Sequence, residues 1–166
     1  MSRMIKMSPL FLLALVLTGC SSTACRQSWK TEFQTLRVEA KINAWHQAAA
    51  LGMYKLYFDA MTDDAVFMGT DASERWGKGA FMEYAREPFA DGHGWTYVAS
   101  DQHVAFSADR RTAWIDEVLA HETYGTLRGT GVLVKVGDDW KIAQYSLTFL
   151  VPNEKAGAVV GVIGGE

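Results

Sequence analysis

The spacing of the apolar residues changes once along this chain, and the change limits the folds that it can adopt. In the first half apolar side chains recur every three or four positions, as in Val38, Ile42 and Trp45, which is typical of helices with one buried face. From about residue 95 apolar and polar residues alternate, which is typical of strands. Helices followed by strands predict an α+β fold, with the helices packed on one face of a mainly antiparallel sheet.

Each expected element has a place in this pattern. The expected helices cover residues 31–52, 54–61 and 78–88. The expected strands cover residues 65–69, 95–106, 112–120, 127–136 and 140–150. The segments between the later strands are short and turn-like, so these strands are expected to form a meander. An irregularity is expected near Ser100 and Asp101.

Composition removes several classes of function. The 166 residues include 16 Lys and Arg against 19 Asp and Glu, which gives a formal net charge of -3 without a basic block. Nucleic acid is therefore not expected as a partner. The four histidines and two cysteines show no short metal-ligand spacing, so no metal is expected. Glycines at 125, 129 and 131 lie between strand patterns and not before a helix, so no nucleotide site is expected. No cofactor of another kind is expected either.

The N-terminal sequence predicts a signal peptide and a lipid anchor. Positive charges at Arg3 and Lys6 precede the apolar run Leu10 to Leu17, which is too short to span a bilayer and has the proportions of a signal peptide. The run ends in Leu-Thr-Gly-Cys, which resembles the bacterial lipobox. This resemblance implies a signal peptide over residues 1–19, lipidation of Cys20 and a tether over residues 20–30. The alternative is an ordinary secretory signal that leaves Cys20 as a free thiol.

The address implied by the lipobox is the cell envelope. Serine at position 21 resembles the sorting signal for the periplasmic face of the outer membrane, if the source is Gram-negative. Cys25 lies within the expected tether, which offers neither a partner base nor a pocket for a catalytic cysteine. It is therefore interpreted as incidental.

The order of elements over residues 31–153 resembles the SnoaL-like branch of the nuclear-transport-factor-2-like (NTF2-like) superfamily. The motifs that carry the resemblance are Ala44-Trp45-His46, Met61 to Phe67, Trp76-Gly77, Gly129 to Val134 and Asp139 to Ala143. The resemblance implies a cone that encloses a pocket, often in a homodimer. Four glycines within the apolar C-terminal segment predict a flexible tail over residues 154–166. Members of the superfamily include isomerases, dehydratases, cyclases and binding modules, so the fold does not decide the function.

The same resemblance argues against isomerase chemistry. The position at which the steroid isomerases carry their aspartate base falls on Gly69, and the position of their oxyanion-binding tyrosine falls on Trp45. Glycine cannot accept a proton, and an indole is a weaker donor than a phenol. The doublet Asp63-Asp64 is interpreted as part of a turn.

The last strand offers candidate ligand contacts. Trp140 and Ile142 are core residues by type, and strict alternation places Gln144, Ser146 and Thr148 on the same face. A polar row that continues an apolar one suits a pocket that binds a ligand by hydrogen bonds. The alternative is that this end of the strand is solvated.

Asp116 and Glu117 are adjacent in a strand, so only one of them can point into the cone. Alternation alone favours Glu117, because its neighbours Ala113, Ile115 and Leu119 are apolar. The resemblance places the inward acidic or basic residue at Asp116, and Asp116 is the residue that we select. The alternative for Asp116 is an exposed cross-strand ion pair with Arg128.

Together these patterns predict a lipid-anchored domain that binds a small, partly apolar molecule without catalysis. The expected ligand-binding residues are Trp45, His46, Phe67, Trp76, Asp116, Thr130, Gln144, Ser146 and Thr148. The first alternative is a dehydratase, isomerase or cyclase that uses Asp116 and His46 as its acid–base pair. The second alternative is an envelope assembly module that acts through its outer surface.

Overall fold

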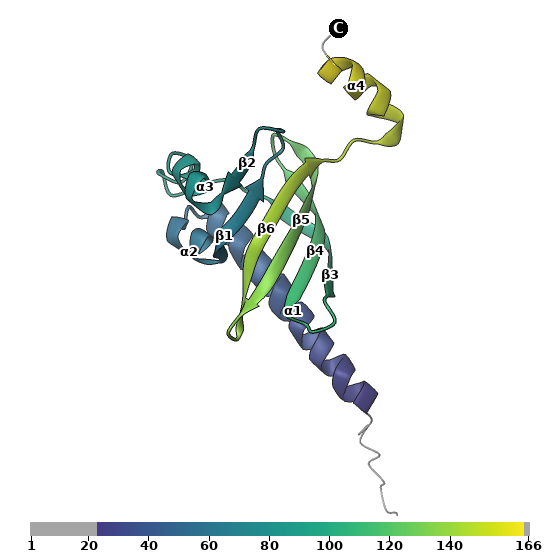
Figure 1. Ribbon diagram of the computed structural model, residues 1–166. Helices are drawn as coiled ribbons and strands as arrows, with labels where there is room; N and C mark the ends of the chain where they lie inside the picture. Colours follow the sequence, from purple (N-terminus) through teal and green to yellow (C-terminus); the bar gives the residue numbers. More distant parts are fainter. Residues whose placement is uncertain (1–22, 165–166) are drawn as a thin grey trace, which may run out of the picture.

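A computed structural model describes residues 23–164, which form a six-stranded sheet covered on one face by helices (Figure 1). The strand order is β2-β1-β6-β5-β4-β3. The strands are β1 (Met61–Met68), β2 (Arg75–Gly77), β3 (Val98–Phe106), β4 (Thr112–His121), β5 (Gly125–Val136) and β6 (Asp139–Phe149). The helices are α1 (Thr23–Ala50), α2 (Tyr54–Asp59), α3 (Lys78–Ala85) and α4 (Ala156–Gly164), with a 3-10 turn at Asn153–Lys155. The predicted α+β fold and meander are confirmed.

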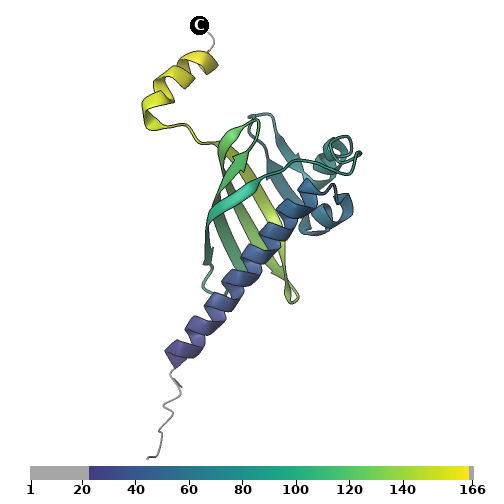
Figure 2. The same cartoon turned by 180° about the vertical axis from the view of Figure 1, so that it is seen from behind.

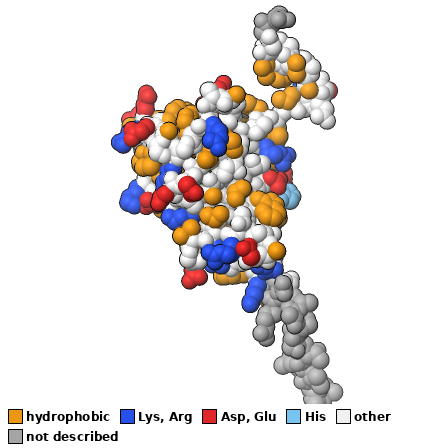
Figure 3. Space-filling view, viewed as in Figure 1, with side chains coloured by type: hydrophobic (Ala, Val, Ile, Leu, Met, Phe, Trp, Pro, Cys, Tyr) orange, Lys and Arg blue, Asp and Glu red, His pale blue; other side chains and the backbone are white. Residues whose placement is uncertain are grey.

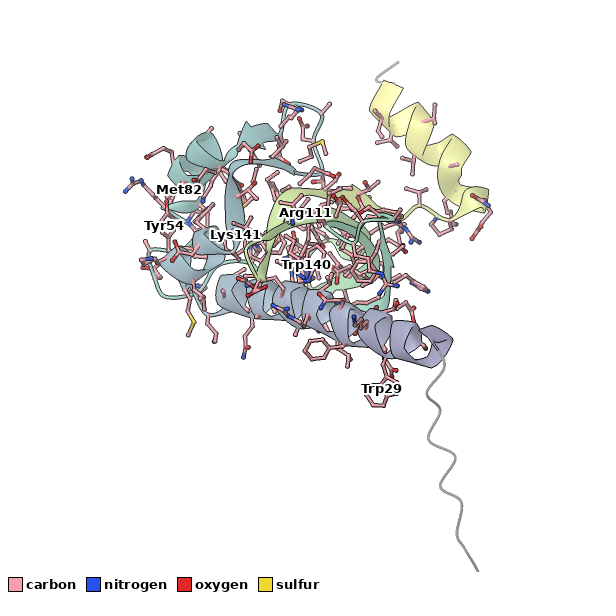
Figure 4. All side chains as sticks on the ribbon, turned by 60° about the horizontal axis from the view of Figure 1, so that its bottom comes forward. Trp29, Tyr54, Met82, Arg111, Trp140 and Lys141 are labelled. Atoms are coloured by element: carbon pink, nitrogen blue, oxygen red, sulfur yellow. The ribbon has the colours of Figure 1, made fainter. Side chains whose placement is uncertain are left out.

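Helix α1 crosses the inner face of the sheet and packs along most of its length (Figure 2). Its predicted apolar face is confirmed, because Val38, Ile42, Trp45 and Ala49 are all buried. The opposite face is exposed near its start, where Trp29 points away from the body (Figure 4). The helix begins at Thr23 and not at residue 31, so residues 23–30, expected to be a tether, are helical.

Trp140 on β6 shows how α1 and the sheet fit together. Its ring lies between the helix and the strands (Figure 4) and is almost completely buried. Its indole Nε1–H donates to Oε1 of Gln34 on α1 at 3.1 Å.

Gly52, with φ +60°, ends the turn after α1. A Cβ there would lie 2.3 Å from the carbonyl carbon of Gly92, so only glycine allows this close approach.

Strand β6 contains a bulge that inverts its side-chain alternation. Leu133 pairs with Ile142, but the next pair along β5 joins Val132 to Gln144. Ala143 is therefore the extra residue, and every side chain beyond it faces the side opposite to the one that strict alternation predicts. The expected irregularity near Ser100 and Asp101 is also present, as a register shift between β3 and β4.

Within residues 23–164 no helix covers the outer face of the sheet, which is turned toward the viewer in Figure 3 and mixes apolar with charged side chains. Trp114 is 48% exposed there.

Helix α4 stands apart from the body (Figure 1), and its side chains Val160, Val162 and Ile163 are exposed. Nine residues of the expected tail form this helix. Among residues 23–164 no helix is both long and apolar enough to cross a membrane. The expected signal peptide and Cys20 lie outside the described residues.

Candidate functional site

A cavity of about 240 Å³, which we call the outer cavity, opens beside β1, β2 and α3. Most of its wall is aromatic, and it contains one carboxylate and one imidazole. Its lining residues are Phe67, Gly69, Thr70, Glu74, Trp76, Phe81, Tyr84, Gly94, Trp95, Tyr97, His121, Tyr124 and Leu147. Neither lysine nor arginine is among these lining residues. Aromatic walls with a few polar groups are the usual make-up of a small-molecule site.

Several aromatic rings of the outer cavity lie nearly parallel. The ring of Phe81 stacks against Phe67 at 4.1 Å with an interplanar angle of 12°, and against Trp76 at 5.6 Å with an angle of 4°. Trp95 lies on Phe81 at 5.8 Å and 19°, while Tyr84 stacks on Trp76 at 4.7 Å. Parallel rings favour a flat ligand, because one more ring can join an offset stack.

Glu74 supplies the carboxylate of the outer cavity. A Cβ at Gly69 would lie 2.0 Å from Oε2 of Glu74, so the carboxylate fills the space that a side chain at position 69 would need. The resemblance placed a catalytic aspartate at position 69, and the structure puts the carboxylate of a different residue beside it. The backbone holds this arrangement, because the Gly69 N–H donates to the carbonyl oxygen of Glu74 at 2.9 Å.

Tyrosines, Thr70 and His121 form the rest of the polar lining. Nδ1 of His121 accepts the backbone N–H groups of Thr123 and Tyr124 at 3.1 and 3.2 Å, which assigns the ring proton to Nε2. Burial, with help from the neighbouring acidic groups Tyr124, Glu74 and Tyr84, raises the pKa of Tyr97 to about 12. Burial and the charge of Glu74 also raise the pKa of Tyr84. These phenols therefore stay protonated at neutral pH.

A second, smaller void of about 10 Å³ lies behind the outer cavity and shares Phe67, Trp95, Tyr97 and Leu147 with it. We call it the inner void. This volume is at the lower limit for one water molecule. Two of its lining residues, Trp45 and Tyr57, are 2% and 1% exposed. Their Nε1 and hydroxyl groups have no hydrogen-bond partner among the described residues.

Tyr57 remains a neutral phenol in this position. Burial raises its pKa well above the ordinary value. Tyr57 and Trp45, which line the inner void, thus each carry a polar group that can donate and has no hydrogen-bond partner among residues 23–164.

A buried polar cluster, which we call the Glu117 network, lies deeper between α1 and the sheet. The Glu117 carboxylate is completely buried and accepts three hydrogen bonds. The donors are Nε2 of His46 at 2.8 Å, the Tyr145 hydroxyl at 2.5 Å and Nε2 of Gln102 at 2.8 Å. Gln102 also donates to Oδ1 of Asn43 at 3.0 Å, which links the network back to α1.

The hydrogen bonds keep Glu117 ionised despite its burial. Burial acts to raise the pKa of Glu117, but the hydrogen bond and charge of His46, with the bonds from Tyr145 and Gln102, outweigh it and lower the pKa. Burial and the Glu117 charge raise the pKa of Tyr145, so its hydroxyl keeps its proton. The bond between them thus joins a charged Glu117 carboxylate to a protonated Tyr145 phenol.

Glycine on β5 makes room for this network. Gly129 pairs with Glu117 on β4 and with Leu147 on β6. A Cβ on Gly129 would lie 2.0 Å from the Tyr145 hydroxyl oxygen, and one on Gly131 would lie 2.9 Å from the same ring. The two glycines of the Gly-Thr-Gly motif therefore let the Tyr145 ring lie across β5 and reach Glu117.

The expectation that Asp116 points into the cone is wrong. Glu117 is buried, and Asp116 lies on the outer face with a half-exposed side chain. Its Oδ2 is 3.3 Å from Nη1 of Arg128 and 3.7 Å from Nδ1 of His103. The cross-strand ion pair is thus what the structure shows. Asp116 lies on the outer face of the sheet, whereas His46 belongs to α1, which packs on the inner face. The two residues therefore cannot form an acid–base pair.

Four further expected contacts also face outward. Thr130 pairs with both Asp116 and Ser146 across the outer face. Gln144, Ser146 and Thr148 follow the bulge at Ala143, which turns them away from the cone and turns Tyr145 and Leu147 into it. Strict alternation failed here because one extra residue inverts the pattern.

The remaining expected residues are divided between the two spaces. Phe67 and Trp76 line the outer cavity, while Trp45 and His46 line the inner void together with Phe67. Sequence reasoning missed Glu74, Trp95, Tyr97 and His121. Trp95 and Tyr97 alternate at the start of the strand pattern and could have been found in that way, whereas nothing in the sequence brings Glu74 to Gly69.

The fold and the cavity define the class of this protein, an NTF2-like cone with an aromatic pocket. A model of the SnoaL-like domain matches residues 38–152, and the chain belongs to that family. No curated protein matches the chain.

Solved structures share the fold at low sequence identity. A candidate scytalone dehydratase from Novosphingobium aromaticivorans aligns with a TM-score of 0.62 and 13% identity, over 75% of this chain and 89% of that one. A protein of unknown function from Mycobacterium tuberculosis has a TM-score of 0.62 and 18% identity, over 88% and 91% of the two chains. A candidate aromatic ring hydroxylase, also from Novosphingobium aromaticivorans, has a TM-score of 0.58 and 19% identity, over 70% and 89%. These likenesses describe the fold and leave the activity open.

Proposed function

We propose that this protein binds a small, flat, partly apolar molecule in the outer cavity and holds it without catalysis. The observation that carries the proposal is the 240 Å³ space walled by nearly parallel aromatic rings. Such a wall gives area and stacking to a ring of one or two cycles. The inner void supports the same function, because its two unused groups can bind one acceptor oxygen of a ligand.

The Glu117 network supports binding without turnover. Its carboxylate already accepts three hydrogen bonds and does not line either space. A group that transfers a proton must be within hydrogen-bond reach of the reacting atom. Glu117 is therefore assigned a structural role in this proposal.

Titration with quinoline, a flat bicyclic base that is uncharged at pH 7.5, tests the proposal. We expect saturable binding that Trp76→Ala weakens by about 2 kcal/mol, or roughly thirtyfold, through lost apolar contact. Trp114→Ala is the matched control on the outer face and should leave the affinity unchanged. Absence of saturable binding, or equal losses in both variants, would contradict the proposal.

Proton-transfer catalysis is a second candidate, because Glu74 offers a carboxylate at one wall and Trp45 and Tyr57 offer polar hydrogens at the inner end. Such an enzyme would remove a proton beside a carbonyl group while the donors hold the oxygen. Solvent deuterium exchange into 2-tetralone, followed by NMR, tests this candidate. Acceleration that falls about 10²- to 10⁴-fold in Glu74→Gln would favour the enzyme, and exchange at the background rate would favour binding alone.

We also propose that the chain is held in the cell envelope by a lipid on Cys20. The support is the short apolar run and the lipobox-like sequence before this residue. Cys20→Ser should abolish lipid labelling and release the protein from the membrane fraction. A variant that is still labelled and still sediments with membranes would refute the anchor.

A homodimer through the outer sheet face completes the proposal. The support is that, among residues 23–164, helices cover only one face of the sheet, which leaves Trp114 exposed on the other face. Sedimentation of the domain without its anchor, at tens of micromolar protein, should show a dimer that Trp114→Arg dissociates. A wild-type monomer would refute this assembly.

A further inference from the structure

The outer cavity carries a negative charge that the protein does not neutralise. Glu74 takes part in no salt bridge among residues 23–164. Its side chain accepts one hydrogen bond within that range, from the backbone N–H of Asp71 at 3.2 Å. His121, the other titratable group that is not a tyrosine, has its Nδ1 occupied as an acceptor. A ligand with a positive charge would supply the missing partner.

The aromatic rings around Glu74 also favour a positively charged ligand. Trp76, Tyr84, Trp95, Tyr97 and Tyr124 all line the outer cavity with Glu74. The face of an aromatic ring carries negative electrostatic potential, and tryptophan and tyrosine faces attract organic cations within about 6 Å. An anionic ligand would face the carboxylate and these ring faces without a lysine or arginine to balance them.

We propose that the outer cavity is selective for organic cations, in which a quaternary or protonated nitrogen is part of, or attached to, a flat ring. The ring would stack in the Trp76–Phe81 series, and the charged nitrogen would lie beside the Glu74 carboxylate. This inference rests on the proposed binding function and adds the class of ligand to it.

Two probes of nearly the same shape test the charge preference. N-methylquinolinium is a permanent cation, and quinoline is its neutral counterpart at pH 7.5. We expect the wild-type protein to bind the cation about tenfold more tightly, which corresponds to about 1.4 kcal/mol. The difference should shrink as salt is added, because the cavity is open to solvent.

Variants place the preference on one carboxylate. Glu74→Gln should weaken N-methylquinolinium about tenfold and change quinoline less than twofold. Gly69→Ala should have the same effect in part, because the new Cβ displaces the Glu74 carboxylate. Asp116→Asn, which removes a carboxylate on the outer face, should change neither affinity.

The outcomes separate this inference from the function on which it rests. Equal or tighter binding of quinoline by the wild type, or an unchanged preference in Glu74→Gln, overturns the cation selectivity and leaves the binding function in place. If neither probe binds saturably, both proposals fail.

Discussion

The outer cavity and the Glu117 network each surround one carboxylate with aromatic side chains, yet they treat it in opposite ways. Glu117 is completely buried, and side chains from α1, β3 and β6 donate to it. Glu74 is partly exposed and accepts one backbone hydrogen bond. The protein satisfies the first carboxylate itself and leaves most of the capacity of the second unused.

Of the two carboxylates, the one with unused hydrogen-bonding capacity is the better candidate for a functional group. A buried acidic residue next to a histidine suggests catalysis when it is found in a sequence or a contact list. Here the geometry shows a closed set of donors and acceptors that joins α1 to the sheet. Groups with unused hydrogen-bonding capacity include Glu74 in the outer cavity, and Trp45 and Tyr57 beside the inner void, so the two spaces form the functional candidate.

The largest effect should come from removing the Glu117 carboxylate. Glu117→Leu leaves the His46, Tyr145 and Gln102 donors without their acceptor, and we expect a loss of about 3 kcal/mol in the free energy of unfolding. Urea denaturation at pH 7 measures the loss. Asp116→Asn, at the neighbouring exposed position, should change the stability by less than about 0.5 kcal/mol. Similar small losses in both variants would show that the network does not stabilise the fold.

A methyl group at position 129 should have the next largest effect. Gly129→Ala places its Cβ against the Tyr145 hydroxyl and should cost about 2 kcal/mol, because a packed interior must shift to accept it. Gly79→Ala is the control, since a Cβ there meets no atom within 4 Å and a helix favours alanine. The account requires opposite signs for the two variants in thermal unfolding, and a neutral Gly129→Ala would contradict it.

The smallest effect is a pH dependence of the Glu117 contribution. The pKa of Glu117 is lowered in the folded protein, whereas the unfolded chain has a value of about 4.3. The ionised network therefore stabilises the fold fully above that value, and its contribution is lost as the pH falls through the lower folded pKa. Urea titrations of wild type and Glu117→Leu should differ more at pH 7 than at pH 3. A difference that grows on acidification would reverse the assigned sign.

Much of the fold could be predicted because periodicity reports which face of an element is buried. Val38, Ile42 and Trp45 were placed correctly on the buried face of α1, and the four long strands were found in order. The short strand β2 was missed, because its three residues are too few to show a period. The extra residue at Ala143 could not be predicted, because a bulge leaves the composition of a strand unchanged and inverts only its facing.

The candidate site was harder to predict because it depends on contacts that are distant in sequence. Alternation with Ala113, Ile115 and Leu119 pointed to Glu117, and the family resemblance led to Asp116 instead. At that position the alternation of apolar residues predicted the inward side chain correctly, and the resemblance did not. Glu74 reaches the outer cavity through a loop whose path no pattern in the sequence reveals, so its role required the structure.

The central claim is that a ligand enters the outer cavity and does not bind on the outer face of the sheet. The chain has six tryptophans, and each gives one indole N–H signal in a ¹⁵N–¹H NMR spectrum. Titration with N-methylquinolinium should shift the signals of Trp76 and Trp95, which line the outer cavity. The signals of Trp114 and Trp140 should stay in place. Shifts at Trp114 with none at Trp76 and Trp95 would place the ligand on the outer sheet face and contradict the account.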